Sequence, residues 1–335
     1  MHLIQLTRTN TFRTNLGVAN PTPDSVRVNV SLRDAGGSEI KTRTLNVPPF
    51  GFLQRNDILG VDAEDAFAVV SSSTPGASYF PYASVVDNRT GDPMMVEPID
   101  PNDQFLVAAA AHVGGLEDTD WRTDLEICNP QTTPIDLQLN LLISGEDNSS
   151  PPAETMTLNQ GACTRMADVL DTVFSHDGTA ALEVHSLSGN VVVSSRTFNT
   201  TDAGTFGQFL PGVGPAAAVT FGQEARIIQL AQDTTDDTGF RTNIGFVNRS
   251  PTVTVIKTDL FSSGGDHLGT VTTRLDPFEH RQKGRIFRQV TSAPVNNGYA
   301  IITTSSTDGS FVAYASVVDN ASGDPIFIPA TRVSS

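Results

Sequence analysis

Phe12-Arg13-Thr14-Asn15-Leu16-Gly17-Val18-Ala19-Asn20 is the first of three copies of one segment, and this repetition decides the fold. The other copies are Trp121-Arg122-Thr123-Asp124-Leu125-Glu126-Ile127-Cys128-Asn129 and Phe240-Arg241-Thr242-Asn243-Ile244-Gly245-Phe246-Val247-Asn248. A second segment, Ala83-Ser84-Val85-Val86-Asp87-Asn88-Arg89-Thr90-Gly91-Asp92-Pro93, is repeated with few changes at residues 315–325. Self-similarity at such long intervals predicts a tandem array of similar modules.

Within each copy the hydrophobic pattern is that of β-strands. Apolar residues alternate with polar ones at residues 26–33 and again at 135–141, while residues 252–260 alternate less cleanly. Turns rich in Gly, Pro and Asp separate these runs at short intervals, which is typical of β-sandwiches and barrels. The apolar residues have a spacing closer to that of a helix in residues 165–174 and in the matching stretches 54–59 and 285–290. We therefore expect a helical turn in each.

The repeat predicts an all-β chain of three tandem β-sandwich modules of about 110 residues. We place them at residues 1–100, 105–213 and 222–331, and the middle module is divergent and carries both cysteines. Linkers are expected near residues 99–104 and 212–223. The second is rich in Gly, Pro and Ala and is expected to be the more mobile.

Composition restricts the partners. The net charge of −16 over 335 residues argues against nucleic acid and anionic membranes, which both reward clustered Lys and Arg. No apolar run is long enough to form a transmembrane segment. Residues 1–30 lack a charged start followed by an apolar stretch, as a mature secreted chain also would. Abundant Ser, Thr, Asn and Gly are typical of an extracellular β-protein surface.

The repeated aromatic-Arg-Thr-Asn/Asp signature is the first candidate site, because side chains alternate along a strand. Its members are Phe12, Arg13 and Asn15, Trp121, Arg122 and Asp124, and Phe240, Arg241 and Asn243. The arginine could hold an acidic ligand or an adjacent module. We favour a structural role, in which the aromatic ring is a core anchor and the arginine pairs within its own sheet or with the next loop.

The second candidate is a calcium site in the loop that closes the first and last modules. Its oxygen-bearing residues are Asp87, Asn88 and Asp92, and Asp319, Asn320 and Asp324. The spacing does not match an EF-hand loop. The same residues suit a tight turn with Asx capping, which is the interpretation we favour, so no cofactor other than this possible Ca²⁺ is expected.

Two cysteines, Cys128 and Cys163, lie in the middle module only, without CxxC spacing or nearby histidines. We favour a disulfide over two buried thiols. Six Asn-x-Ser/Thr triplets are weak glycosylation signals, and we expect them in exposed loops or strand edges: Asn29, Asn88, Asn148, Asn199, Asn248 and Asn320.

Nothing in the sequence predicts catalysis, and we expect no enzyme. The six histidines occupy unrelated positions in the three copies, and no nucleophile-elbow, zinc-protease or phosphate-loop motif is present. The stretch from Ala110 to Asp120, with His112, Glu117 and Asp118, is the closest to an active-site insertion. A long hairpin-like loop explains it better.

The two repeated segments resemble those of uncharacterised secreted bacterial proteins made of tandem immunoglobulin-like β-sandwich modules. The resemblance covers nearly the whole chain. It implies export and an immunoglobulin-like fold for each module, and it supplies no catalytic residues. The Asp87/Asp319 loop is missing from the middle copy, so a role of that loop cannot be common to all three.

We therefore expect a non-catalytic extracellular or cell-surface structural protein, a filament or assembly subunit that contacts itself or other surface proteins through strand edges. The alternative is an adhesion module that binds a glycan or another surface polymer. That function predicts exposed aromatic residues, and Trp and Tyr are scarce here. A minor alternative is a hydrolase that uses carboxylates in a cleft between modules.

Overall fold

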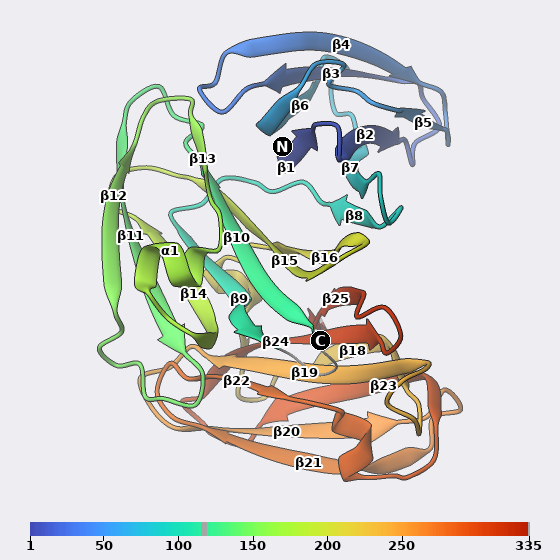
Figure 1. Cartoon of the computed structure of the whole chain (residues 1–335), viewed down its shortest axis with the longest axis vertical. Helices are drawn as coiled ribbons and strands as arrows, with labels where there is room; N and C mark the ends of the chain where they lie inside the picture. Colours follow the sequence, from blue (N-terminus) through green and yellow to red (C-terminus); the bar gives the residue numbers. More distant parts are fainter. Residues whose placement is uncertain (115–118, 334–335) are drawn as a thin grey trace.

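Strands make up nearly every long element of the chain. The computed structural model describes residues 1–114 and 119–333 (Figure 1). The helices of this described part are α1 (Val169–Phe174) and the 3₁₀ helices η1 (Pro215–Ala217) and η2 (Ile286–Gln289), and none is long and apolar enough to cross a membrane. The prediction of an all-β chain is confirmed, and its strands form several sheets.

The strands fall into three groups, which we call the first, second and third repeats. The first repeat contains β1 (His2–Arg8), β2 (Phe12–Ala19), β3 (Val26–Arg33), β4 (Glu39–Val47), β5 (Phe52–Arg55), β6 (Ala63–Ser72), β7 (Phe80–Asp87) and β8 (Pro93–Val96). The second contains β9 (Gln104–Gly114), β10 (Asp120–Cys128), β11 (Ile135–Ile143), β12 (Ala153–Leu158), β13 (Cys163–Met166), β14 (Gly178–Ser186), β15 (Val192–Thr201) and β16 (Gly204–Pro211). The third contains β17 (Val219–Thr220), β18 (Ala225–Gln232), β19 (Phe240–Asn248), β20 (Thr254–Phe261), β21 (His267–Leu275), β22 (His280–Lys283), β23 (Val295–Thr304), β24 (Ser310–Asp319), β25 (Pro325–Pro329) and β26 (Thr331–Arg332).

The order of strand pairing recurs in the three repeats. In the first, one sheet has the order β1-β6-β3-β4 and the other β5-β2-β7-β8. The third repeat has β18-β23-β20-β21 and β22-β19-β24-β25 in the same relation, with the short β26 and β17 added at the edges. The second has β9-β14-β11-β12 and β13-β10-β15-β16, which join because Gly114 of β9 also pairs with Asp120 of β10. Apart from β17 and β26, each strand of one repeat therefore has a counterpart in the others.

The inward faces of these strands form the core, as the alternation predicts. Val26, Val28, Val30 and Leu32 are all buried. The matching strand β20 alternates too, but Thr254 and Thr258 take two of its buried positions, and this is why its pattern is unclear in the sequence. Buried threonines at strand positions fit because their branched side chains pack on a pleated surface.

The expected helical turns differ between repeats. The second has α1 and the third has η2, each beginning after a residue in the left-handed region, Asp168 (φ 46°) and Arg285 (φ 48°). In the first repeat Asp57 also has a positive φ of 47°, but residues 54–59 hold the end of β5 and a turn, so the prediction of a helical turn was wrong there.

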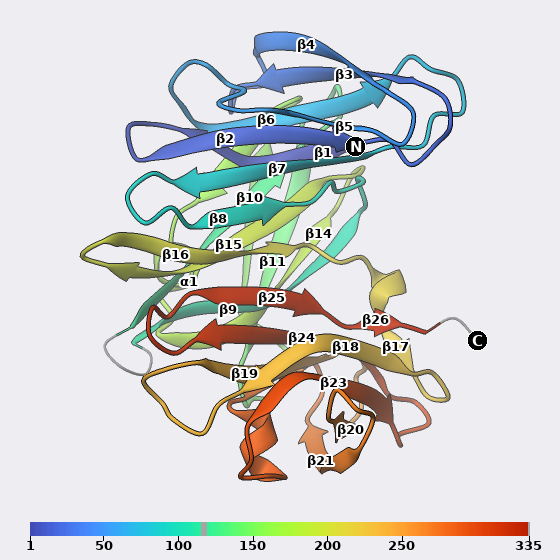
Figure 2. The same ribbon diagram turned by 90° about the vertical axis from the view of Figure 1, so that its right-hand side faces the viewer.

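The repeats are packed against one another, with the second between the other two (Figure 1). Figure 2 shows β8, β16 and β25, one from each repeat, side by side along one flank, and β16 contacts both of the others. The segment that the sequence predicts to be the more mobile linker, residues 212–223, contains η1 and β17, and β17 pairs with β24.

Candidate functional site: the surfaces between repeats

The signature threonine fastens two successive strands in every repeat. Thr14 accepts a hydrogen bond from the backbone N–H of Thr7 (3.1 Å) and donates to its carbonyl (2.7 Å). Thr242 does the same with Ala231, at 3.1 and 2.6 Å, and Thr123 accepts from the N–H of Ala111 at 2.8 Å. These hydroxyls replace ladder bonds where the chain passes from one sheet to the other, so the signature threonine is structural.

The signature Asn or Asp binds the backbone N–H of a left-handed residue in each repeat, and this residue begins the helical turn of the second and third repeats. The side-chain oxygen of Asn15 accepts a hydrogen bond from the N–H of Asp57 (3.1 Å). Asp124 accepts from Asp168 (2.9 Å) in the same way. Asn243 accepts from Arg285 (3.1 Å). A positive φ is costly for a residue with a Cβ, and the bond stabilises it.

The signature arginine joins the two repeated segments. Arg13 donates to the side-chain oxygen of Asn88, and Arg241 donates to that of Asn320 (2.8 Å). In the second repeat, Arg122 pairs instead with Asp120 (2.7 Å) and Asp168 (3.3 Å).

The prediction that the signature aromatic is a core anchor was wrong for Phe240, whereas Phe12 packs against the core. Phe240 is 42% exposed, and Phe12 and Trp121 are only partly buried. These rings lie at the start of their strands, near the sheet edge. Phe12 lies under the guanidinium of Arg196, 5.2 Å from its ring centre.

In the loops of the predicted calcium site, the carboxylates accept hydrogen bonds from N–H and hydroxyl groups of the protein. Asp87 accepts from the N–H of Arg89 (2.8 Å) and, across the boundary between repeats, from the N–H and hydroxyl of Thr205 (both 3.0 Å). Burial acts to raise the pKa of Asp87, but these hydrogen bonds lower it below its usual value. Asp319 likewise accepts from the N–H groups of Ala321 and Ser322.

Two of these loops approach each other over β16. Asp92 accepts from the N–H of Gly207 in β16 (2.8 Å). Burial, together with the charges of Asp92 and Asp319, raises the pKa of Asp324 to about 6. The sequence places these carboxylates in separate loops, and only the fold brings Asp92 and Asp324 together.

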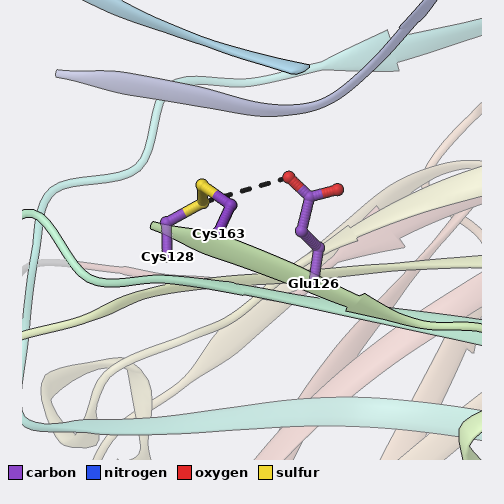
Figure 3. A group of neighbouring side chains, drawn as sticks. All are labelled: Glu126, Cys128 and Cys163. Carbon is purple, nitrogen blue, oxygen red and sulfur yellow. Dashed lines mark hydrogen bonds between the residues drawn. A yellow bond between two sulfur atoms is a disulfide. The ribbon is translucent and has the colours of Figure 1, made fainter. Parts of the chain in front are cut away.

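The surface between the first and second repeats contains a buried ion pair and the two cysteines. Glu126 of β10 is fully buried and pairs with Arg165 of β13 (2.7 Å), while its other oxygen accepts from the backbone N–H of Gln5 in β1 (3.0 Å). Burial raises the pKa of Glu126 although Arg165 opposes the shift. Cys128 and Cys163 form a disulfide beside Glu126 (Figure 3).

The surface between the second and third repeats combines neutral hydrogen bonds with an ion pair between Arg249 of the third repeat and Glu183 of β14. Ser144, after β11, forms a hydrogen bond with Nδ1 of His280 in β22, and the backbone N–H of Gly145 donates to the carbonyl of His280 (3.0 Å). The other ring nitrogen of His280 lies 3.0 Å from the hydroxyl of Tyr314, which donates to Gln282 (3.1 Å). Burial lowers the pKa of His280 to about 4, so the ring is neutral at pH 7.

These two surfaces use the same strands. Between the first pair of repeats, β1 contacts β10 and β15, and β6 contacts β13. Between the second pair, the counterpart β9 contacts β19 and β24, and β14 contacts β22. The hairpin that follows the third strand of a repeat also contacts the next repeat at both surfaces. The carbonyl of Ala35 accepts from the N–H of Cys163 (2.8 Å), and the N–H of Gly145 donates to the carbonyl of His280 (3.0 Å).

A cleft of about 680 Å³ opens beside the second of these surfaces. Trp121 of β10 and Arg241 of β19 line it, together with Arg281 and Arg285. Among its described lining residues there is no Asp or Glu. A carboxylate-based hydrolase site, the minor alternative from the sequence, therefore has no acidic pair in this lining.

The stretch singled out as a possible insertion borders this cleft, because Ala110, Ala111 and Val113 line it. β9 and β10 flank the stretch as a hairpin, and Glu117 and Asp118 lie outside the described residues. Nδ1 of His112 lies 2.8 Å from Asp168, and Nε2 lies 3.2 Å from Asp177. His112, Asp168 and Asp171 are close enough together to hold a cation, but Asp168 already pairs with Arg122.

The prediction that the Asn-x-Ser/Thr triplets are exposed was wrong for most of them. Four of the six asparagines are buried: Asn148, Asn199, Asn248 and Asn320. Asn248, for example, donates to the carbonyls of Thr252 and Asp276 (both 2.8 Å). Asn and Asp side chains often bond to nearby backbone in this way, and the triplet pattern does not distinguish that use.

No family model matches the chain, and no curated protein matches it. Among solved structures, it is similar to dimeric latent PorU from Porphyromonas gingivalis, with 10% identity over 99% of this chain and a TM-score of 0.18. It spans 33% of that PorU chain. It is also similar to a protein of the infectious bursal disease virus Gx strain, with 9% identity over 97% of this chain and 77% of that one and a TM-score of 0.17. Similarity this low leaves function to be argued from the chain's own residues.

Proposed function

We propose that the chain is a non-catalytic extracellular structural protein, in which three immunoglobulin-like β-sandwich modules form one rigid subunit of a cell surface or of a larger assembly. The observation that carries this proposal is the use of the signature residues. Their side chains bond to the chain's own backbone and side chains in all three repeats. Residues kept for holding the fold indicate a scaffold rather than a reaction site.

The contacts between repeats support the same function. Buried polar contacts join each neighbouring pair of repeats, which supports a rigid arrangement rather than flexibly linked modules. The Cys128–Cys163 disulfide suits an oxidising compartment outside the cytoplasm. Open edges for lateral contacts are available on β4, β12 and β21, the last strands of their sheets.

Localisation and thiol state test this function. Antibodies raised against the purified chain should label intact cells of the organism that makes it. In material isolated with a thiol-trapping reagent, Cys128 and Cys163 should be oxidised. A chain confined to the cytoplasmic fraction, with both thiols free, would contradict the proposal.

A second candidate function is the binding of an acidic surface polymer, such as a glycan, in the cleft beside Trp121. It is favoured by the aromatic ring and the arginines of the lining, which contrast with the acidic chain as a whole. Calorimetric titration with acidic polysaccharides should then give binding that Trp121→Ala abolishes. Leu187→Ala, at an exposed site in the same repeat, is the control that keeps binding.

A further inference from the structure

The surfaces that join the repeats can be compared position by position from the strand registers. On the docked face of the second repeat, one row across the sheet is Cys163, Cys128 and Val192, and the next is Arg165, Glu126 and Ser194. In the third repeat the corresponding rows are His280, Val247 and Val312, then Gln282, Gly245 and Tyr314. We call this surface, built on β13-β10-β15 or β22-β19-β24, the head face.

The first repeat has the same head face, on β5-β2-β7, and no other part of the described chain covers it. Its rows are Phe52, Ala19 and Phe80, then Gln54, Gly17 and Tyr82. Phe52 is 54% exposed and Phe80 is 63% exposed, whereas the counterparts His280 and Val312 are 1% and 8% exposed. Adjacent to this face, Phe50 is 73% exposed.

The free head face already has the internal geometry of a docked one. Tyr82 donates to Gln54 (2.6 Å), as Tyr314 donates to Gln282 (3.1 Å). The ring of Tyr82 stacks parallel to Phe52, with centres 6.0 Å apart, and Tyr314 stacks on His280 at 6.4 Å. In both repeats the tyrosine lies over a glycine that leaves room for it, Gly17 or Gly245. The aromatic surface is therefore preorganised for a protein partner.

The opposite surface, which receives a head face, we call the tail face. In the first repeat it is formed by β1 and β6, and in the second by β9 and β14. The third repeat presents the same strands, β18 and β23, without a partner in the described chain. Ile4 and Ala108 hold one equivalent position and are buried, but their counterpart Ile228 is 59% exposed. Large exposed apolar residues at both ends indicate interaction surfaces.

The backbone of the free tail face also matches. Gln5 has a φ of 68° at an irregularity in β1, and this conformation presents its N–H to Glu126 of the second repeat. Gln229 has a φ of 62° at the corresponding irregularity in β18 and is exposed. A non-glycine residue held at positive φ is strained, and strain of this kind often marks a functional contact.

We propose that the head face of one copy docks on the tail face of a second copy, so that copies associate head to tail through the same surface that joins the repeats within one chain. This inference rests on the proposed structural function and names its self-association surface. A heterologous contact of this type produces open filaments unless the rotation between copies closes a ring. The strand edges then serve lateral contacts only.

The test measures the molar mass of the purified chain by size-exclusion chromatography with light scattering, up to about 1 mM, where even millimolar affinities are visible. The wild type should form a concentration-dependent series of oligomers. Phe52→Glu blocks the head face and Ile228→Glu blocks the tail face. Each should weaken association by about 30-fold or more, the loss typical of a charge placed in an interface hot spot. Leu187→Glu, at a similarly exposed apolar residue, should associate like the wild type.

Mixing the two blocked variants makes the test specific. The tail face is intact in Phe52→Glu and the head face is intact in Ile228→Glu. An equimolar mixture should therefore form dimers of twice the chain mass and nothing larger. Circular dichroism and thermal unfolding of each variant should match the wild type, because the altered positions are exposed.

Other outcomes would overturn the inference. A wild type that stays monomeric over the whole range contradicts it, and so does association that both blocked variants retain. The second result would leave the structural function standing with lateral contacts instead. A monomeric chain that binds polysaccharide, and loses the binding in Phe52→Glu, would assign the head face to a glycan.

Discussion

The head face of the second repeat carries a buried ion pair and a disulfide, whereas the equivalent rows of the third repeat hold neutral residues and the ion pair of that surface, Arg249 with Glu183, lies outside these rows. Both are built on the same strand positions, yet Arg165 and Glu126 on one correspond to Gln282 and Gly245 on the other. The difference shows that the backbone geometry of docking is repeated while its chemistry is not. Each repeat can therefore recognise its own neighbour, since a head face with a buried charge needs its own compensating partner.

The largest expected effect follows from leaving the buried charge unpaired. Arg165→Gln removes the partner of Glu126 and should lower the free energy of unfolding by about 3 to 5 kcal/mol. Because the pKa of Glu126 is already raised by burial, the deficit should shrink as the pH falls and the carboxyl group is protonated in the folded state. Urea unfolding between pH 7 and pH 4 measures this.

The matched control is the double variant Arg165→Gln with Glu126→Gln, which makes these two positions neutral, as they are at their counterparts Gln282 and Gly245. It should recover most of the lost stability. A double variant as unstable as the single one would mean that the ion pair is not the source of the loss.

Removal of the disulfide tests the second feature that is particular to this surface. Cys128→Ala with Cys163→Ala should lower stability by about 3 kcal/mol at pH 7, because the crosslink restricts the unfolded chain. Thermal unfolding of the wild type in reductant should show the same shift, and reductant should not change the variant. Equal stability of the wild type and the variant would contradict this expectation.

The surface between the second and third repeats should be weakened by acid through His280. Burial holds the pKa of His280 at about 4 in the folded state, below the ordinary histidine value of 6.5. The folded state thus binds fewer protons, and stability should be lost as the pH falls through this window. At pH 5 the loss should reach roughly 2 kcal/mol.

His280→Gln keeps a hydrogen-bonding side chain that does not titrate. The difference in unfolding free energy between pH 7 and pH 5 should therefore be smaller in this variant than in the wild type. The same pH dependence in both proteins would show that other groups dominate.

The smallest effect concerns the flank where the first and third repeats meet over β16. The pKa of Asp324 is raised to about 6 by burial and by the charges of Asp92 and Asp319, so its ionised form is unfavourable at pH 7. Asp324→Asn should stabilise the protein by about 0.5 kcal/mol, since the half-exposed side chain is screened by solvent. The gain should disappear at pH 4, and a gain that persists there would contradict the charge explanation.

Much of the fold could be predicted from local patterns. Alternation identified strands such as β3 and β11 because each has one buried and one solvated face. The failures have physical reasons. Buried threonines obscured the alternation of apolar and polar residues in β20. The signature aromatic rings stand at the starts of strands, where a hydrophobic side chain need not be buried.

The surfaces between repeats could not be predicted in the same way. Ser144 and His280 lie 136 residues apart, and no local pattern links a serine in a hairpin to a histidine in a short strand. The sequence does carry a signal for the free head face. Phe50, Phe52 and Phe80 are large apolar residues next to prolines and turns, and the scarcity of Trp and Tyr does not report on such phenylalanines.

The equivalence of the docking faces is the central claim, and site-specific crosslinking tests it most directly. Gln5 donates to the backbone of Ser194 (3.4 Å), and the counterparts of these residues on the free faces are Gln229 and Tyr82. Copies carrying Gln229→Cys should therefore form mixed disulfides with copies carrying Tyr82→Cys, far faster than either forms with Leu187→Cys copies. Crosslinking no faster than with the Leu187→Cys control would contradict the head-to-tail account.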